Sequence, residues 1–201
     1  AMYYRLLASK ILPPQLDRIL YLDPDTLAIN SLRPRYDTGL GNTLFAAAAH
    51  PGLTSITTHI HRLRPGTPAA ENYFNYGGLL PNLKEQRARL SEREIFAYVR
   101  AKGEELILPD QDVLNALYGQ EILPLDDSLY NYDARRYETY FLTSNGEKDL
   151  DWVMANTVIL HYCGREKPWQ KSTRGRFASL YKHYAHMARM QGECAGRPAI
   201  G

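Results

Sequence analysis

The sequence predicts an α/β fold, because short apolar runs of strand length alternate with segments of helical periodicity. Residues 44–49 and 158–160 are apolar runs of the first kind. Two helical segments begin at recognisable signals, a capping box of Ser91 with Glu94 and the Pro109-Asp110 pair. Alternating strands and helices are typical of a sheet covered by helices.

In the first half of the chain, apolar spacing predicts a helix up to residue 11, which Pro13 and Pro14 end. Three strands are then expected, at residues 18–23, 44–49 and 77–83. Pro24 supports the end of the first strand, since proline cannot donate to a sheet. Residues 50–72 are rich in Pro, Gly, Thr and His and predict a long loop.

In the second half, a helix is expected from Ser91 to a stop at Gly103, followed by a short strand at 106–108. A second helix opens at Pro109 and closes at Gly119, and the strand at 158–160 ends at His161. After Pro168, a last helix is expected to carry an apolar side made of Phe177, Leu180, Tyr181, Tyr184 and Met187.

The composition is that of a soluble globular protein with one substantial core. The chain has 201 residues, of which 44% are hydrophobic and 23% charged. A net charge of +2 gives no reason to expect a nucleic-acid partner. Cys163 and Cys194 are too few for a disulfide framework and predict reduced thiols of a cytosolic protein. We find no apolar run of membrane-spanning length and no signal peptide.

Asp23 and Asp25 form the sharpest local feature. In extended chain, side chains two residues apart project to the same side of a strand end. Two such carboxylates repel each other unless a proton or cation lies between them, and a divalent cation with oxygen ligands is one solution. The alternative is an Asp-Pro-Asp turn in which the aspartates cap local backbone donors. An Asp-x-Asp triplet alone does not decide between the two.

His161 follows its strand as Asp23 follows an earlier one. An imidazole beside two carboxylates suits Mn²⁺ better than Ca²⁺, although a histidine at a strand end is also common as a hydrogen-bonded structural residue. The run after it contains Gly164, which permits close approach of the backbone to a ligand, and Lys167, which can neutralise phosphate oxygens.

Four motifs, in their order along the chain, resemble glycosyltransferase family 8. They are YLDPD (21–25), YFNYG (73–77), PDQDVLN (109–115) and HYCGREKPW (161–169). The resemblance covers residues 3–169, and the family includes bacterial lipopolysaccharide galactosyl- and glucosyltransferases and glycogenin. It implies a GT-A (nucleotide-diphospho-sugar transferase) fold with a mixed sheet flanked by helices. It also implies a hexosyltransferase that moves glucose or galactose from its UDP-sugar, with retention, to a saccharide or glycolipid acceptor.

The resemblance also implies roles for individual residues. Asp23, Asp25 and His161 match the ligands of Mn²⁺, for which Mg²⁺ could substitute. The positions expected to bind the donor substrate are Arg5, Asn75, Asp110, Gln111, Gly164 and Lys167. Asp110 and Gln111 are the expected catalytic residues, with Gln111 beneath the anomeric carbon. Since an amide is a poor nucleophile, we favour same-face attack with Gln111 stabilising the oxocarbenium-like species. From the sequence alone, Asp110 is also a good N-cap for a helix beginning at Gln111.

Departures from the family pattern affect the expected sugar site. The family has a small residue at the position of Tyr76 and apolar residues at those of Gly78 and Pro81. Tyr76 is expected either to crowd the sugar pocket or to turn away from it, and Pro81 predicts a strand edge or a bulge. Family members also carry upstream strands that bind uracil and ribose, so we expect this chain to lack the opening nucleoside-binding strands.

The pattern divides the chain into a catalytic domain at residues 1–170 and a basic, aromatic helical tail at 171–201. The tail is expected either to make peripheral membrane contact or to pack on the domain with a solvated basic face. The expected location is the cytoplasm, including the inner face of the membrane. The acceptor is expected at the 50–72 loop, which carries His59, His61, Arg62 and Arg64.

Two other functions stay open at this point. One is a sugar-nucleotide-binding module of weak activity, in which Tyr76 blocks transfer. The other is a metal-dependent phosphohydrolase that uses the same two carboxylates, although no second metal cluster or general base stands out.

Overall fold

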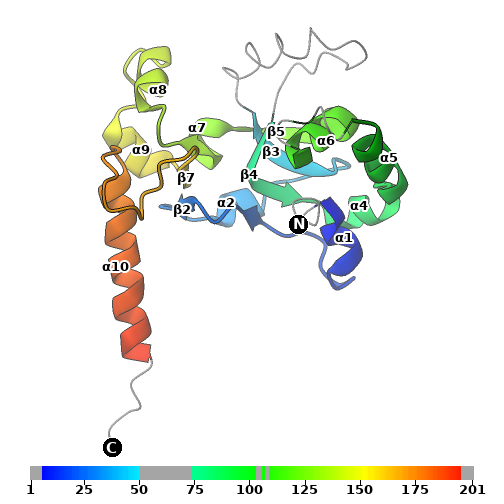
Figure 1. The fold of residues 1–201 in the computed structure, drawn as a ribbon, viewed down its shortest axis with the longest axis horizontal. Coiled ribbons are helices and arrows are strands. Elements are labelled where there is room, and N and C mark those ends of the chain that lie inside the picture. Colours follow the sequence, from blue (N-terminus) through cyan, green and yellow to red (C-terminus); the bar gives the residue numbers. More distant parts are fainter. Residues whose placement is uncertain (1–5, 50–73, 103–105, 107–108, 196–201) are drawn as a thin grey trace, which may run out of the picture.

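A computed structural model describes residues 6–49, 74–102, 106 and 109–195, and its centre consists of two small sheets (Figure 1). The first sheet has the strand order β1-β4-β3-β5 and the second has the order β2-β7-β6. The strands of the first are β1 (Tyr21–Leu22), β4 (Phe74–Pro81), β3 (Phe45–Ala49) and β5 (Ile122–Asp126). Those of the second are β2 (Thr26–Ala28), β7 (Ile159–His161) and β6 (Tyr132–Asp133).

Both sheets are mixed, as predicted. In the first, β4 is antiparallel to β1 and β3, whereas β3 and β5 are parallel. In the second, β7 is antiparallel to β2 and parallel to β6. Residues 23–25 connect β1 to β2, so the two aspartates lie where the chain passes from one sheet to the other.

Helices surround the two sheets at opposite ends of the molecule (Figure 1). Near the first sheet lie α1 (Ala8–Ile11), α4 (Leu83–Arg89), α5 (Glu92–Lys102) and α6 (Pro109–Tyr118), followed by the 3₁₀ turn η3 (Gly119–Glu121). Near the second lie α7 (Asp127–Tyr130), α8 (Tyr137–Thr143), α9 (Leu150–Asn156) and α10 (Ala178–Ala195), while α2 (Arg33–Tyr36) follows β2. The helices thus flank the sheets, as expected of an α/β fold.

Each sheet has its own apolar core, and a smaller cluster of Leu40, Ala46 and Leu80 buries the other face of the first sheet. The first core joins Leu79 of β4 to Ile95 of α5 and Leu114 of α6, all fully buried. The second is mainly aromatic, with the rings of Tyr132 and Tyr140 stacked 4.2 Å apart between centroids. The 23–25 connection therefore joins two sheets that have separate cores.

Several predicted elements are confirmed. The runs 44–49 and 158–160 are β3 and β7, and the helix expected at 109–119 is α6. Ser91 Oγ accepts the N–H of Glu94 at 3.3 Å, as in a capping box, while the N–H of Ser91 donates to the hydroxyl of Tyr118 at 3.3 Å.

Other boundaries were wrong. The strand expected at 77–83 is β4, which begins three residues earlier. It ends two residues earlier, because Asn82 accepts the N–H of Glu85 and caps α4. The strand expected at 18–23 is only β1, with one further bridge from Arg18 to Asn82. β4 has a register shift opposite Ala47 and Ala48, so its bulge lies at 76–78 and not at Pro81. Residues 50–72, Gly103 and most of 106–108 lie outside the described residues.

The α10 helix extends away from the second sheet (Figure 1). Phe177, just before it, is buried, and Tyr181 packs edge-on against Tyr162 at 5.7 Å between centroids. Further along the predicted apolar side, Tyr184 and Met187 are 37% and 44% exposed. The apolar side is therefore covered only near the start of the helix, and the division into 1–170 and 171–201 stays a prediction. Within the described ranges, no helix combines the length and apolarity needed to cross a membrane.

Candidate functional site

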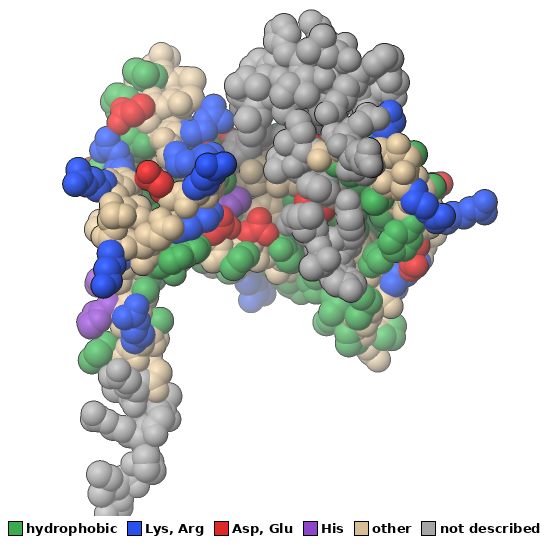
Figure 2. Space-filling view, viewed as in Figure 1, with side chains coloured by type: hydrophobic (Ala, Val, Ile, Leu, Met, Phe, Trp, Pro, Cys, Tyr) green, Lys and Arg blue, Asp and Glu red, His purple; other side chains and the backbone are tan. Residues whose placement is uncertain are grey.

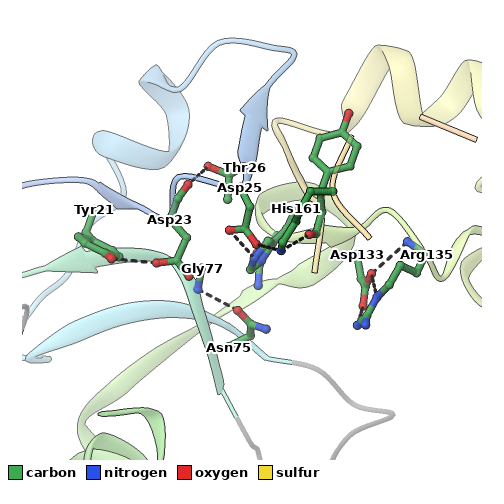
Figure 3. A network of polar contacts seen from close by, with 12 residues as sticks. Tyr21, Asp23, Asp25, Thr26, Asn75, Gly77, Asp133, Arg135 and His161 are labelled. Carbon is green, nitrogen blue, oxygen red and sulfur yellow. Dashed lines mark hydrogen bonds and ion pairs between the residues drawn. The ribbon is translucent and has the colours of Figure 1, made fainter. Parts of the chain in front are cut away.

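Asp23 and Asp25 lie in a tight turn between β1 and β2. The N–H of Asp23 donates to Gly77 O of β4 at 2.8 Å, and Asp23 O accepts the N–H of Thr26 at 3.1 Å. Pro24 takes the second position of this turn, which its fixed φ favours. The expected extended geometry is thus wrong for Asp25, and the Asp-Pro-Asp turn is present. The turn nevertheless leaves both carboxylates close together, and Tyr21 Oη donates to Asp23 Oδ1 at 2.8 Å (Figure 3).

His161 completes the cluster from the end of β7. Its backbone pairs with Thr26 of β2, so β2–β7 pairing brings the imidazole to the turn. The ring is 5% exposed and its Nε2 lies 3.2 Å from Asp25 Oδ1. One donor atom from each of Asp23, Asp25 and His161 lies within 4.8 Å of the other two. The structure therefore brings together all three predicted ligands.

The ammonium group of Lys167 contacts the second carboxylate oxygen of Asp25. Its Nζ donates to Asp25 Oδ2 at 2.6 Å and to Tyr162 O at 2.9 Å. Its backbone is held separately, because Thr173 Oγ1 donates to Lys167 O at 2.5 Å. In the space-filling view, acidic and histidine side chains lie in a recess with Lys and Arg side chains gathered along one side (Figure 2).

The charges of this cluster influence one another. Burial acts to raise the pKa of Asp25, but the hydrogen bond from Lys167, the proximity of His161 and the charge of Lys167 outweigh it, so this pKa lies below its usual value. Burial lowers the pKa of His161 despite the nearby carboxylates of Asp25 and Asp23. Near neutral pH Asp25 thus offers a carboxylate and His161 a neutral imidazole, the protonation states that metal ligands need.

Asn75 and Gly77 of β4 border the cluster (Figure 3). Asn75 Oδ1 accepts the N–H of Gly77 at 2.8 Å. A Cβ atom built on Gly77 would overlap the His161 ring. The predicted donor-site residue Asn75 therefore lies beside the carboxylate-imidazole cluster.

Asp110 and Gln111 lie in the first turn of α6. The helix begins at Pro109, so Asp110 lies inside its first turn and is not the N-cap of a helix that begins at Gln111. Asp110 is buried and its Oδ1 accepts the N–H of Gln111 at 2.9 Å. One turn later, Asn115 Oδ1 accepts the N–H of Phe74 at 3.1 Å, which anchors α6 next to Asn75.

Of two other positions predicted to bind the donor, the structure describes Gly164 but not Arg5. Gly164 has φ +87°, a conformation that glycine favours, and Arg135 packs over it. Arg5 lies outside the described residues, as do the histidines and arginines of the 50–72 loop.

The departures at Tyr76 and Gly78 have structural explanations. Tyr76 is fully buried in the core of the first sheet, so its ring turns away from the cluster. Gly78 O accepts a hydrogen bond from the buried guanidinium of Arg35 at 2.5 Å. A Cβ atom at Gly78 would lie 3.2 Å from Arg35 Nη2, so a larger residue would press on this arginine.

Sequence reasoning missed two polar residues beside His161, and the arginine that holds one of them. Asn131 Oδ1 lies 2.8 Å from His161 Nδ1. Asp133 pairs in register with His161 and is held by Arg135 through two hydrogen bonds of 2.9 and 2.6 Å. β6 has only two residues, Tyr132 and Asp133, so the sequence offered no periodic signal that could have found them.

Comparisons with known proteins agree with this geometry. The family model described as "Glycosyl transferase family 8" matches residues 1–173. The chain belongs to glycosyltransferase family 8. General stress protein A of Bacillus subtilis (strain 168) is 26% identical over 211 residues, covering 100% of this chain and 69% of that protein.

Two further known proteins are also similar to this chain. Lipopolysaccharide 1,2-glucosyltransferase of Escherichia coli (strain K12) is 30% identical over 178 residues, covering 85% of this chain. The crystal structure of the galactosyltransferase LgtC with donor and acceptor sugar analogues has a TM-score of 0.73 at 28% identity, covering 92% of this chain and 66% of that one. The fold is therefore the GT-A fold, as predicted. The chain spans 49% of the length of the E. coli glucosyltransferase, about half.

Proposed function

We propose that this chain forms the metal- and sugar-binding part of a retaining hexosyltransferase, which transfers glucose or galactose from a UDP-sugar to a saccharide or glycolipid acceptor. In this proposal residues 1–170 are catalytic and 171–201 form the tail. The family includes enzymes named as lipopolysaccharide glucosyl- and galactosyltransferases, which supports this class of donor and acceptor.

The observation that best supports the proposal is that Asp23, Asp25 and His161 lie close together. Two carboxylates and a neutral imidazole within 4.8 Å suit a divalent cation that accepts mixed oxygen and nitrogen ligands. Mn²⁺ fits this donor set best, and Mg²⁺ is the second choice. A divalent cation bound there would supply charge stabilisation for the departing UDP.

The remaining roles fall to side chains around this cluster. Lys167 lies 2.6 Å from Asp25, so its ammonium is placed beside the position where a diphosphate would meet the cation. Gly164 and Arg5 are proposed to contact the donor, the former through its exposed backbone. Asn75 and Asp110 are proposed to bind the donor sugar from β4 and the start of α6.

Gln111 is proposed to stabilise the oxocarbenium-like species while the acceptor attacks from the face that UDP leaves. This accounts for retention without a protein nucleophile, for which the amide is poorly suited. Preorganised dipoles of this kind are usually the largest contribution to such catalysis.

The two other functions are less well supported. A binding module was considered because Tyr76 could block the sugar, but this ring is buried in the core. A phosphohydrolase with two metals would need a second ligand cluster, and within the described residues Asp23, Asp25 and His161 are the one group found.

Incubation of the full-length protein with UDP-glucose or UDP-galactose, Mn²⁺ and an acceptor panel tests the proposal. We expect release of UDP that is lost in Asp25→Asn and kept in Asp37→Asn, a matched change at an exposed carboxylate on the end of α2. UDP binding without release would favour a binding module. Release of UMP and a hexose phosphate would favour a phosphohydrolase.

A further inference from the structure

Asn131 is buried between α7 and β6, with no measurable side-chain exposure. Its N–H donates to Asp127 O at 2.9 Å, so its backbone is held by the last turn of α7. From this position its Oδ1 lies 2.8 Å from His161 Nδ1. The side chain therefore contacts the nitrogen of the imidazole that faces away from Asp25.

An amide oxygen can only accept a hydrogen bond, so Nδ1 of His161 must carry the hydrogen in this contact. A neutral imidazole then has its lone pair on Nε2. This Nε2 is the atom that lies 3.2 Å from Asp25 Oδ1. At this distance the lone pair and the carboxylate oxygen repel each other, and a cation bound between them would stabilise the arrangement.

The ring is also held on its other sides. The backbone of Gly77 lies so close that any Cβ atom there would overlap Cε1 and Nδ1. Arg35 ties the two supporting segments together, since its guanidinium donates to Gly78 O at 2.5 Å and to Tyr130 O at 3.0 Å. The residues next to Gly77 and Asn131 are thus joined through one buried side chain.

We propose that Asn131 is a positioning residue that holds His161 in its Nδ1–H tautomer and so presents Nε2 to a divalent cation at Asp23 and Asp25. The inference rests on the proposed metal site and adds the group that orients its nitrogen ligand. Hydrogen-bond partners of metal-binding histidines typically change metal affinity by about 10–100-fold when removed.

The test measures Mn²⁺ affinity by calorimetry and by the electron paramagnetic resonance signal of free Mn²⁺, without any sugar nucleotide. Asn131→Leu keeps the size of the side chain and removes the acceptor, so we expect Mn²⁺ to bind about 10–100-fold more weakly. Asn131→Asp restores an acceptor and no donor, so we expect affinity within a few-fold of the wild type. Asn82→Leu is the matched control, because Asn82 is a buried asparagine that caps α4. It should lower stability and leave Mn²⁺ affinity unchanged.

A second measurement is independent of the metal. Long-range ¹H–¹⁵N spectra of the metal-free protein should show the proton of His161 on Nδ1 in the wild type and a shift toward Nε2 in Asn131→Leu. An Nε2–H tautomer in the wild type would overturn the inference, as would unchanged Mn²⁺ affinity in the folded Leu variant. If the wild type itself binds no Mn²⁺, the proposed metal site fails, while the tautomer measurement still decides the role of Asn131.

Discussion

The imidazole of His161 lies directly against the backbone of Gly77, leaving no room for a Cβ atom between them. The same glycine accepts the N–H of Asp23 through its carbonyl at 2.8 Å. One residue of β4 thereby sets the spacing between the turn that carries the carboxylates and the strand end that carries the imidazole.

Gly77→Ala should displace the His161 ring. The φ of Gly77 is not positive, so the cost is steric, and overpacking of this kind lowers the free energy of unfolding by about 1–3 kcal/mol. We also expect weaker Mn²⁺ binding, because Nε2 moves away from Asp25. Chemical denaturation and calorimetry measure the two effects. Gly39→Ala is the control, since nothing lies within 4 Å of a Cβ atom there. Equal Mn²⁺ affinity in both variants would contradict the prediction.

Lys167→Met should change Mn²⁺ and UDP affinity in opposite directions. The ammonium lies 2.6 Å from Asp25 Oδ2, so its removal takes away a positive charge that repels a cation at the same carboxylate. Mn²⁺ alone should bind about 3–10-fold more tightly after screening by solvent is allowed for. UDP in the presence of Mn²⁺ should bind more weakly, because a phosphate contact is lost.

Two titrations of Lys167→Met, with Mn²⁺ alone and with UDP at saturating Mn²⁺, measure these effects. Lys171→Met, an exposed lysine of the same loop, should change neither. Parallel losses of both affinities would mean that Lys167 acts by holding the loop and not by its charge.

Gln111→Ala should slow transfer severely while UDP and Mn²⁺ affinities stay close to those of the wild type. The hydrogen bond that Asn115 makes to residue 111 goes to its backbone oxygen at 2.9 Å, so truncation of the side chain leaves α6 anchored. Steady-state UDP release and equilibrium binding of UDP are the two measurements. Gln120→Ala, an exposed glutamine in η3, serves as the comparison. Unchanged turnover in Gln111→Ala would remove this residue from the mechanism.

Arg35→Lys should destabilise the fold although it keeps the charge. Arg35 is fully buried, and burial lowers its pKa to about 10. Its planar guanidinium donates to both Gly78 O and Tyr130 O, which a single ammonium cannot reproduce. One buried carbonyl then loses its donor, which costs about 1–3 kcal/mol in the free energy of unfolding.

Urea unfolding checks this value against Arg33→Lys. Arg33 pairs with Asp37 at the surface, where its side chain is 82% exposed, and such pairs contribute little. Equal unfolding midpoints for the two variants would mean that the two carbonyls find other donors.

The elements that could be predicted are those whose pattern is local. β3 and β7 are short apolar runs, and α6 has a proline at its start with Val113 and Leu114 on its buried side. β1 was predicted too long, at 18–23, and β6 was not predicted, since two residues carry no period. They are strands because β4 and β7 lie beside them and supply hydrogen-bond partners.

The sequence by itself determined which groups could carry the chemistry, because Asp23, Asp25, His161 and Lys167 stand in recognisable motifs. The tertiary structure decided how these four side chains are brought together. Lys167 contacts Asp25 across 142 residues of chain, and the pairing of β2 with β7 places His161 beside the same carboxylate. It also decided that Tyr76 enters the core and that Asn131 faces the imidazole. Contacts between distant segments depend on how the two cores pack, which no local pattern in the chain records.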